Sequence, residues 1–228
     1  RVGHDRVMVD AVVFDLDGVL VDSERAWDDA RRALVRERGG RWRPEAQRAM
    51  MGMSSPEWSR YLRDELGVDM APEDISREVV ERLVAGYRRH LPLLPGAVEA
   101  VRALGARWPL GLASSSNRPV IDLVLDLAGL AGEFAVTVSS EEVARGKPAP
   151  DVYLEAARRL GVASEACVAV EDSTNGLRSA AAAGMRVVAL PKRDYPPAPD
   201  ALALADVRLG SLDELRPELI EALDRRGA

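Results

Sequence analysis

The sequence predicts an α/β fold in which a doubly wound, Rossmann-like parallel sheet core carries an inserted all-helical cap domain. Three observations predict this class. Short continuous apolar runs recur along the chain, segments with helical spacing lie between them, and one long stretch after the first run has helical spacing alone. Because strands alternate with single helices, we expect right-handed crossovers and a mainly parallel sheet covered on both faces.

Five apolar runs predict the strands, and each is of the kind that is buried on both faces of a parallel sheet. They occupy residues 12–14, 110–113, 134–138, 168–170 and 187–190. Apolar residues at helical spacing predict helices around residues 153–160 and 177–181. The proline-rich residues 191–199 are expected to form a surface loop.

Residues 23–92 depart from this alternation, because they contain helical patterns and no comparable strand run. The patterns are Trp27, Ala30 and Leu34 early in the segment and Ile75, Val79 and Leu83 later in it. A proline-bearing stretch at residues 91–96 then forms a stiff hinge before the strands resume. We therefore predict a core made of residues 1–22 and 93–228 and a helical cap made of residues 23–92.

Composition excludes several classes of protein. The chain has 228 residues, of which 47% are hydrophobic, and a net charge of −6 with its arginines interleaved among acids. Nucleic-acid binding by a broad positive face is therefore not expected. No run approaches eighteen apolar residues, and residues 1–6 lack the apolar stretch of a signal peptide. We expect a cytoplasmic protein with no membrane partner.

Cysteine and histidine are too scarce for several common active sites. Cys167 is the only cysteine and lies within an apolar run, which excludes a disulfide or a zinc site within one chain and disfavours a catalytic thiol. His4 and His90 lie outside every cluster described below. A serine triad or a histidine-rich metal site is therefore hard to build.

Two carboxylates, Asp15 and Asp17, follow the first predicted strand. Side chains alternate in an extended chain, so both can project to one side, and Gly18 would permit the sharp turn that follows. One carboxylate can attack phosphorus while its neighbour carries a proton, and the two together invite Mg²⁺. On its own, this motif also fits an Asp-rich turn that has no catalytic role.

Further polar clusters follow the later strands, at the edge where such sheets bind ligands. Residues 114–117 are hydroxyl and amide side chains that either cradle phosphate oxygens or simply cap a helix. Lys147 lies in a proline-fixed loop and could neutralise both phosphate and the nucleophile's carboxylate. Glu171 and Asp172 form a second acidic pair. Two such pairs close together would repel each other unless a cation lay between them.

These clusters occur in the order of the four motifs of the haloacid dehalogenase superfamily, and the chain resembles its capped subgroup of β-phosphoglucomutase-like enzymes and phosphatases. The matching residues are Asp15-Leu16-Asp17-Gly18, Ser114, Lys147 and Glu171-Asp172. The match covers nearly the whole chain, and the combination of four motifs is far more specific than any one of them.

The resemblance implies a role for each of the charged residues. Asp15 is the implied nucleophile, Asp17 the general acid and base, and Lys147 the third catalytic residue. The implied cofactor is Mg²⁺, with Asp15, Asp172 and Asp17 as ligands; Asp17 binds it in this family through its backbone carbonyl. Glu171 is a possible further ligand, either directly or through water.

The resemblance also implies how phosphate is bound, and together with the residues discussed below it favours one reaction. Ser114 and Lys147 are the implied phosphate-binding pair, and Ser115 and Asn117 join them in the cradle. The chain is then a Mg²⁺-dependent phosphatase that hydrolyses a small phosphomonoester, a sugar or polyol phosphate, through an aspartyl-phosphate. Its partner is a small phosphorylated metabolite, and no obligate protein partner is evident. The cap is expected to close over the site and exclude water.

A phosphosugar mutase of the β-phosphoglucomutase type is the main alternative. Those mutases grip a second phosphate with a lysine and an arginine near the cap's substrate loop, and carry a histidine early in the first cap helix. Here Trp27 takes the position of that histidine, and residues 50–58 lack the charged pair. Hydrolysis is therefore favoured.

Two questions stay open at this stage. Met50, Met51, Met53 and Trp58 either pack the cap or contact the substrate. A non-catalytic phosphate-binding or partner-binding relative would be expected to have lost one of the catalytic residues, and none is lost.

Overall fold

A six-stranded parallel sheet lies at the centre of the structure, in the order β3-β2-β1-β4-β5-β6. The computed structural model describes residues 8–51 and 53–223 of the chain. The strands are β1 (Ala11–Phe14), β2 (Leu110–Ser114), β3 (Val136–Ser139), β4 (Cys167–Glu171), β5 (Arg186–Ala189) and β6 (Val207–Arg208). The predicted α/β class with a parallel, Rossmann-like sheet is confirmed.

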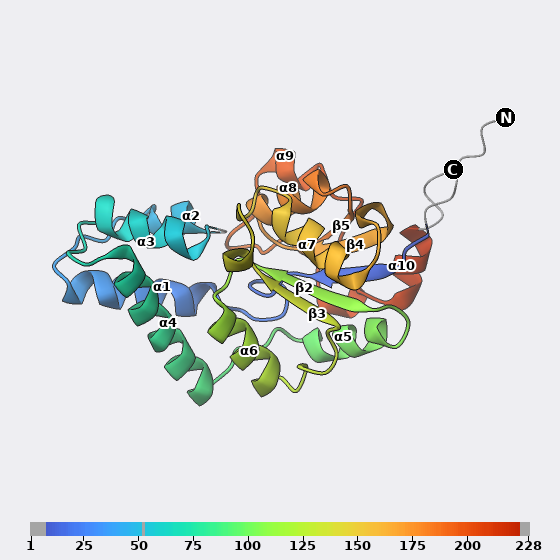
Figure 1. Ribbon diagram of the computed structural model, residues 1–228, viewed down its shortest axis with the longest axis horizontal. Coiled ribbons are helices and arrows are strands. Elements are labelled where there is room, and N and C mark those ends of the chain that lie inside the picture. The colour runs from blue at the N-terminus through green and yellow to red at the C-terminus, as the bar shows by residue number, and fades with distance from the viewer. Residues whose placement is uncertain (1–7, 52, 224–228) are drawn as a thin grey trace.

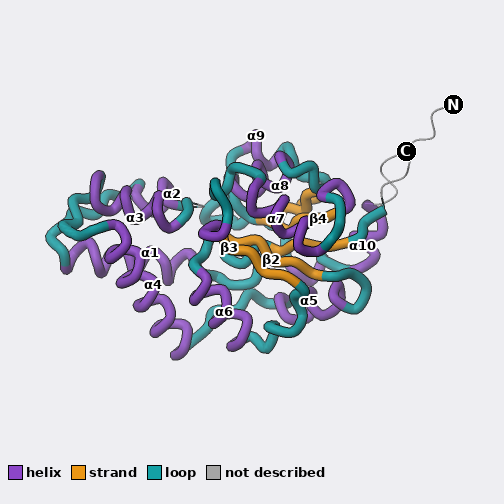
Figure 2. The backbone as a smooth tube through the Cα atoms, viewed as in Figure 1, coloured by secondary structure: helices purple, strands orange, loops and turns teal. Residues whose placement is uncertain are grey.

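Helices cover both faces of the sheet, as Figures 1 and 2 show. Because strand residues alternate, Val12 and Phe14 of β1 face one layer while Ala11 and Val13 face the other. The first layer contains α5 (Ala97–Gly105), α6 (Arg118–Leu127) and α10 (Pro217–Leu223). The second contains α7 (Asp151–Leu160), α8 (Thr174–Ala182) and α9 (Pro199–Leu202).

Two details of the strand prediction are wrong, and both concern the edges of the sheet. The third strand begins at Val136 instead of residue 134, because Phe134 turns out of the sheet and packs edge-on against Phe14, with 6.0 Å between ring centroids. This edge strand is only half-buried at Val136 and Thr137. The short β6 was not predicted, since two residues give no recognisable apolar run.

Four helices fill the segment between β1 and α5, which we call the helical insertion (residues 23–92). They are α1 (Glu24–Glu37), α2 (Ala46–Met50), α3 (Ser55–Asp64) and α4 (Pro72–Arg89). The chain leaves and rejoins the sheet side by side, since Val21 and Leu93 form an antiparallel bridge and the Asp22 N–H donates to the Pro92 carbonyl at 2.8 Å. The boundaries of a separate cap domain stay a prediction.

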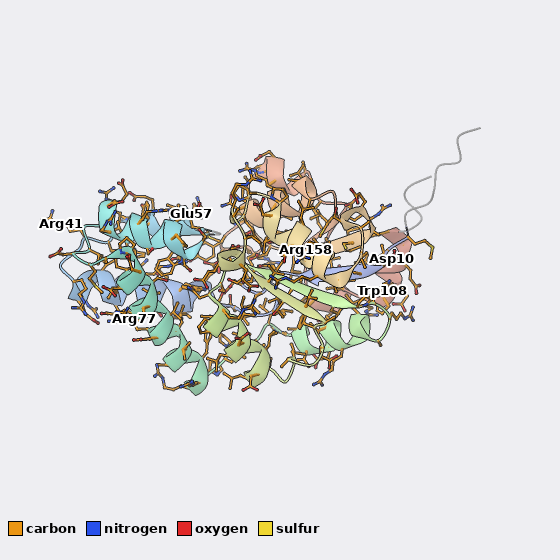
Figure 3. All side chains as sticks on the ribbon, viewed as in Figure 1. Asp10, Arg41, Glu57, Arg77, Trp108 and Arg158 are labelled. Carbon is orange, nitrogen blue, oxygen red and sulfur yellow. The ribbon has the colours of Figure 1, made fainter. Side chains whose placement is uncertain are left out.

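The helical insertion lies beyond the carboxyl ends of the central strands. In Figure 3, Asp10 and Trp108, which precede β1 and β2, lie at the opposite end of the sheet from Arg41 and Arg77 of the insertion. Parallel sheets bind ligands beyond their carboxyl ends, so this is the side on which a site is expected. Within the described residues, no helix combines the length and apolar character needed to cross a membrane.

The layers predict how two leucines on neighbouring helices respond to truncation. Leu104 of α5 is fully buried, whereas Leu127 at the end of α6 is 43% exposed. Leu104→Ala should lower the free energy of unfolding by about 2–5 kcal/mol, and Leu127→Ala by less than about 1 kcal/mol. Urea denaturation followed by circular dichroism measures both values. Equal losses would contradict the burial of the α5 layer.

Candidate functional site

The register of the central strands brings two carboxylates together. Phe14 of β1 pairs with Val170 of β4, so the residues that follow them, Asp15 and Glu171, are neighbours across the two strands. Side chains alternate along each strand, so Asp15 lies on the same face as Val13, and Glu171 on the same face as Ala169. Val13 and Ala169 both pack in the layer that contains α7. Asp15 and Glu171 therefore project to the same face of the sheet at its carboxyl edge.

Lys147 lies between these two carboxylates. Its loop precedes α7, and its Nζ donates to Asp15 Oδ1 at 2.7 Å and to Glu171 Oε1 at 2.6 Å. Tyr153 of α7 supports the pair: its hydroxyl donates to Glu171 Oε1 at 3.0 Å, and its ring centroid lies 4.9 Å from Lys147 Nζ. All four residues are buried. The lysine thus lies beside the first carboxylate in a fixed position.

Asp17 is held by one group from each side of the site. The Trp27 indole N–H, from α1 of the insertion, donates to Asp17 Oδ1 at 3.0 Å, and the Ser116 hydroxyl donates to Oδ2 at 2.6 Å. The turn that follows Asp17 depends on Gly18, which has a φ of +86°. A Cβ at this position would collide with the Asp172 carboxylate. Of the two groups that hold the Asp17 carboxylate, the Trp27 indole is in place only when the insertion lies against the sheet.

A small cavity of about 60 Å³ joins these groups. This is small beside the roughly 300–1,000 Å³ of a typical small-molecule pocket. Its lining combines charged groups of the sheet edge with apolar and polar groups of the insertion: Asp15, Asp17, Glu24, Trp27, Arg31, Met50, Met51, Met53, Trp58, Ser115, Ser116, Lys147, Asp172 and Ser173. The insertion therefore forms one wall of the cavity and narrows it.

The three polar residues expected to cradle phosphate occupy different places. Ser115 lines the cavity, and its buried hydroxyl has no hydrogen-bond partner within the described structure. Ser114 is fully buried behind it and accepts a hydrogen bond from the Ser116 N–H at 2.9 Å. Asn117 lies outside the cavity, where its amide accepts from the Ser55 hydroxyl and donates to Glu141. It links the insertion to the core.

Asp172 is suited to hold a cation. In the described part of the chain, Asp15, Glu171 and Asp172 are the one acidic group whose ligand atoms lie within 4.8 Å of one another. Asp172 Oδ1 is buried with no hydrogen-bond partner there. Such an oxygen is costly unless a proton or a cation compensates it. A hard divalent cation, which prefers carboxylate oxygens, fits this donor set.

Glu171 is engaged differently. Besides Lys147 and Tyr153, its carboxylate accepts hydrogen bonds from the Asp172 N–H at 2.9 Å and from the N–H and hydroxyl of Ser173 at 3.1 and 3.2 Å. A carboxylate with so many donors has little capacity left for a metal ion. Its contacts fit a residue that positions Lys147.

The environment raises the pKa of the Asp15 and Asp172 carboxyls. Burial raises the pKa of Asp15 to about 8, with Glu171 and Asp17 adding to the effect and Lys147 opposing it. Burial, followed by the charges of Glu171 and Asp15, also raises the pKa of Asp172 well above its usual range. Burial alone would lower the pKa of Lys147, but Asp15 and Glu171 outweigh it and raise that pKa. The lysine therefore stays charged.

Sequence reasoning missed several residues of the site. Ser116 was seen only as part of a polar run, and Tyr153 only as an apolar position of a helix. Glu24 and Arg31 were not singled out, although both line the cavity. Their spacing from Trp27, three residues before and four after, places all three on one face of α1 and was the available signal.

Other groups considered from the sequence lie away from the cavity. Cys167 is buried in β4, where burial raises its thiol pKa to about 11, so it stays protonated near neutral pH. His90 is exposed at the end of α4, and His4 lies outside the described residues.

Comparison with known proteins places the chain among hydrolases. Residues 9–184 match a family described as haloacid dehalogenase-like hydrolase. Hexitol phosphatase B of Escherichia coli (strain K12) is 36% identical over 211 residues, covering 90% of this chain and 93% of the relative.

Two solved structures are also similar. CbbY from Rhodobacter sphaeroides, crystallised in complex with phosphate, matches with a TM-score of 0.81 at 32% identity, over 91% of this chain and 96% of the other. β-Phosphoglucomutase from Clostridium difficile matches with a TM-score of 0.83 at 23% identity, over 96% and 98% of the two chains. At that identity the second likeness shows the fold alone.

The raised carboxyl pKa values predict how the stability of the metal-free protein depends on pH. The folded chain holds protons on Asp15 and Asp172 that the unfolded chain releases above about pH 4, so stability should fall as the pH rises toward 8. In chelator, the thermal midpoint should be lower at pH 8 than at pH 6. Saturating Mg²⁺ should raise it most at pH 8, because the cation favours the ionised carboxylates.

Asp172→Asn is the control for this prediction, since it removes the buried, unpartnered carboxylate oxygen. The gain in thermal midpoint from Mg²⁺ should shrink in this variant. A pH dependence that is identical with and without the cation would contradict a metal site at Asp15 and Asp172.

Proposed function

The chain belongs to the haloacid dehalogenase-like hydrolases, and from this premise we propose that it hydrolyses a sugar or polyol phosphate through an aspartyl-phosphate on Asp15. One observation carries the proposal: the buried Asp15 carboxylate, bonded to Lys147 Nζ at 2.7 Å, faces a small cavity that Asp17 also lines. The hexitol phosphatase relative supports a polyol or sugar ester as the substrate class.

The first half-reaction uses Asp15 as nucleophile. A carboxylate oxygen of Asp15 attacks phosphorus, and the bond from phosphorus to the substrate's ester oxygen breaks. Asp17 donates a proton to that oxygen, which leaves as an alcohol. Lys147 balances negative charge on the phosphoryl oxygens and on Asp15, and the unpartnered Ser115 hydroxyl is free to donate to the phosphate.

The second half-reaction returns the enzyme to its starting state. Asp17, now ionised, accepts a proton from a water molecule as the water oxygen attacks phosphorus. The bond between phosphorus and the Asp15 oxygen breaks, and inorganic phosphate leaves. Trp27 and Ser116 hold the Asp17 carboxylate for both proton transfers.

We propose Mg²⁺ as the cation of this site, with Asp15 and Asp172 as its side-chain ligands. The backbone carbonyl of Asp17 joins them by the family resemblance. The cation would neutralise charge between the nucleophile and the phosphate. Glu171 acts through Lys147 in this proposal, because its carboxylate already accepts hydrogen bonds from several donors.

The nucleophile can be tested with a matched pair of variants at the two ends of β1. Asp15→Asn should lower phosphate release from a hexitol phosphate by roughly 10⁴-fold or more, because an amide oxygen is a poor nucleophile. Asp10→Asn is the control, since Asp10 is exposed at the other end of β1. Activity comparable to wild type in Asp15→Asn, with an unchanged circular dichroism spectrum, would remove Asp15 from this role.

Mutase activity can be tested by product partition. With β-glucose 1-phosphate and a sugar bisphosphate primer, the protein should release inorganic phosphate faster than it forms glucose 6-phosphate. The physical reason is that residues 50–58 contain no lysine or arginine to hold a second phosphate, and that Glu24 also lines the cavity. A coupled assay for each product measures the ratio, and faster formation of glucose 6-phosphate would favour the mutase.

A further inference from the structure

Arg31 is an incompletely partnered cation inside the active-site cavity. It lies on α1, lines the cavity that Asp15 and Asp17 also line, and is only 5% exposed. Its Nε is buried without a hydrogen-bond partner in the described structure, and its Nη1 reaches the Gln47 side chain only at 3.5 Å. A buried guanidinium with an unused donor is costly unless something else occupies it.

Two tryptophans hold this guanidinium in place. The Arg31 Cζ lies 4.7 Å from the ring centroid of Trp27 and 5.0 Å from that of Trp58, and the two rings meet edge to face. Stacking of this kind orients the planar group and leaves its N–H donors pointing along the ring planes. Trp27 also bonds Asp17, so the arginine is one side chain away from the proposed acid.

Hydrogen-bond acceptors lie on the same wall. Glu24 also lines the cavity, and Gln47 donates to its carboxylate at 2.8 Å while facing Arg31 with its carbonyl. A second anionic group held by Arg31 would therefore lie beside Glu24. A hydroxyl both accepts and donates, so it satisfies an arginine and a glutamate together. This wall fits the hydroxyls of a neutral alcohol better than a second phosphate.

Building on the proposed function, we propose that Arg31 is a specificity-determining residue that, with Glu24, hydrogen-bonds the hydroxyls in the alcohol part of a polyol or sugar phosphate. Trp27 and Trp58 supply the apolar wall against which the carbon chain lies. The phosphate end remains with Asp15 and Lys147. The contact therefore acts on the choice of alcohol and leaves phosphate binding alone.

The test compares two substrates in the wild type and in variants of two adjacent arginines. The substrates are a hexitol phosphate, sorbitol 6-phosphate, and p-nitrophenyl phosphate, which has no hydroxyl chain. Arg31→Met should lower kcat/KM for the hexitol phosphate by roughly 10- to 100-fold, mainly through KM, and change it less than about threefold for the aryl phosphate. Arg31→Lys should give an intermediate, equally selective loss.

Arg32→Met is the matched control. Arg32 also lies on α1 and over a tryptophan, with its Cζ 5.1 Å from the Trp42 centroid, but its side chain is 51% exposed and it does not line the cavity. The control should leave both substrates unaffected. If Arg31→Met does not fold, Arg31→Lys decides the question by the same comparison.

Three results would overturn the inference about Arg31 alone. They are an equal loss on both substrates, no loss on either, or an Arg31-dependent preference for a sugar bisphosphate over the hexitol phosphate. A wild-type protein that hydrolyses neither substrate would instead overturn the proposed function, and the role of Arg31 with it.

Discussion

The charged contact among Lys147, Asp15 and Glu171 is the interaction on which the rest of the site depends. The parallel register of β1 and β4 places two carboxylates side by side in a buried setting, which is unfavourable unless a cation lies between them. Lys147 is that cation, and its raised pKa, despite burial, shows that the carboxylates dominate its environment. Removing the lysine would leave two buried carboxylates without their shared partner.

This arrangement also explains why the two adjacent acids, Glu171 and Asp172, have different contacts. Glu171 is occupied by Lys147, Tyr153 and neighbouring backbone N–H groups, so it fixes the lysine. Asp172, one residue further along, keeps an unpartnered oxygen. Adjacent residues at a strand end point in different directions. Glu171 can therefore position Lys147 while Asp172 is free to bind a cation.

The sequence predicts the parts of this site that follow strand ends. Asp15, Asp17, Lys147 and Asp172 each come after an apolar run, and parallel topology gathers such positions at one edge. Helical positions are harder to predict. Arg31 and its neighbour Arg32 are the same residue type in the same helix, yet one is buried in the cavity and the other exposed. Helical spacing places Arg31, four residues after Trp27, on the face of that tryptophan, but only the packing of α1 against the sheet edge makes that face a wall of the cavity.

The same limit applies to Asn117. It was predicted to help bind phosphate because it lies in a polar run that follows a strand. Its amide instead joins Ser55 of the insertion to Glu141 of the core. Whether a polar side chain at a strand end faces the ligand or a neighbouring element depends on contacts made by residues far away in sequence. Local pattern carries no information on such contacts.

One helix face connects catalysis to substrate choice. Glu24, Trp27 and Arg31 follow one another at helical spacing along α1, and all three line the cavity. Trp27 orients Asp17 only when α1 lies against the sheet edge, and that same position brings Arg31 and Glu24 to the alcohol end of the site. The cavity is small in this arrangement, so on the proposed function we expect α1 to withdraw and return in each catalytic cycle. An alcohol that satisfies Arg31 and Glu24 is bound more tightly once α1 has returned, and the same return brings Trp27 to Asp17. An alcohol that leaves them unpaired is bound less tightly. In the proposed mechanism α1 therefore carries both tasks on one face, since Glu24 and Arg31 lie on either side of Trp27, the residue that orients the proposed acid.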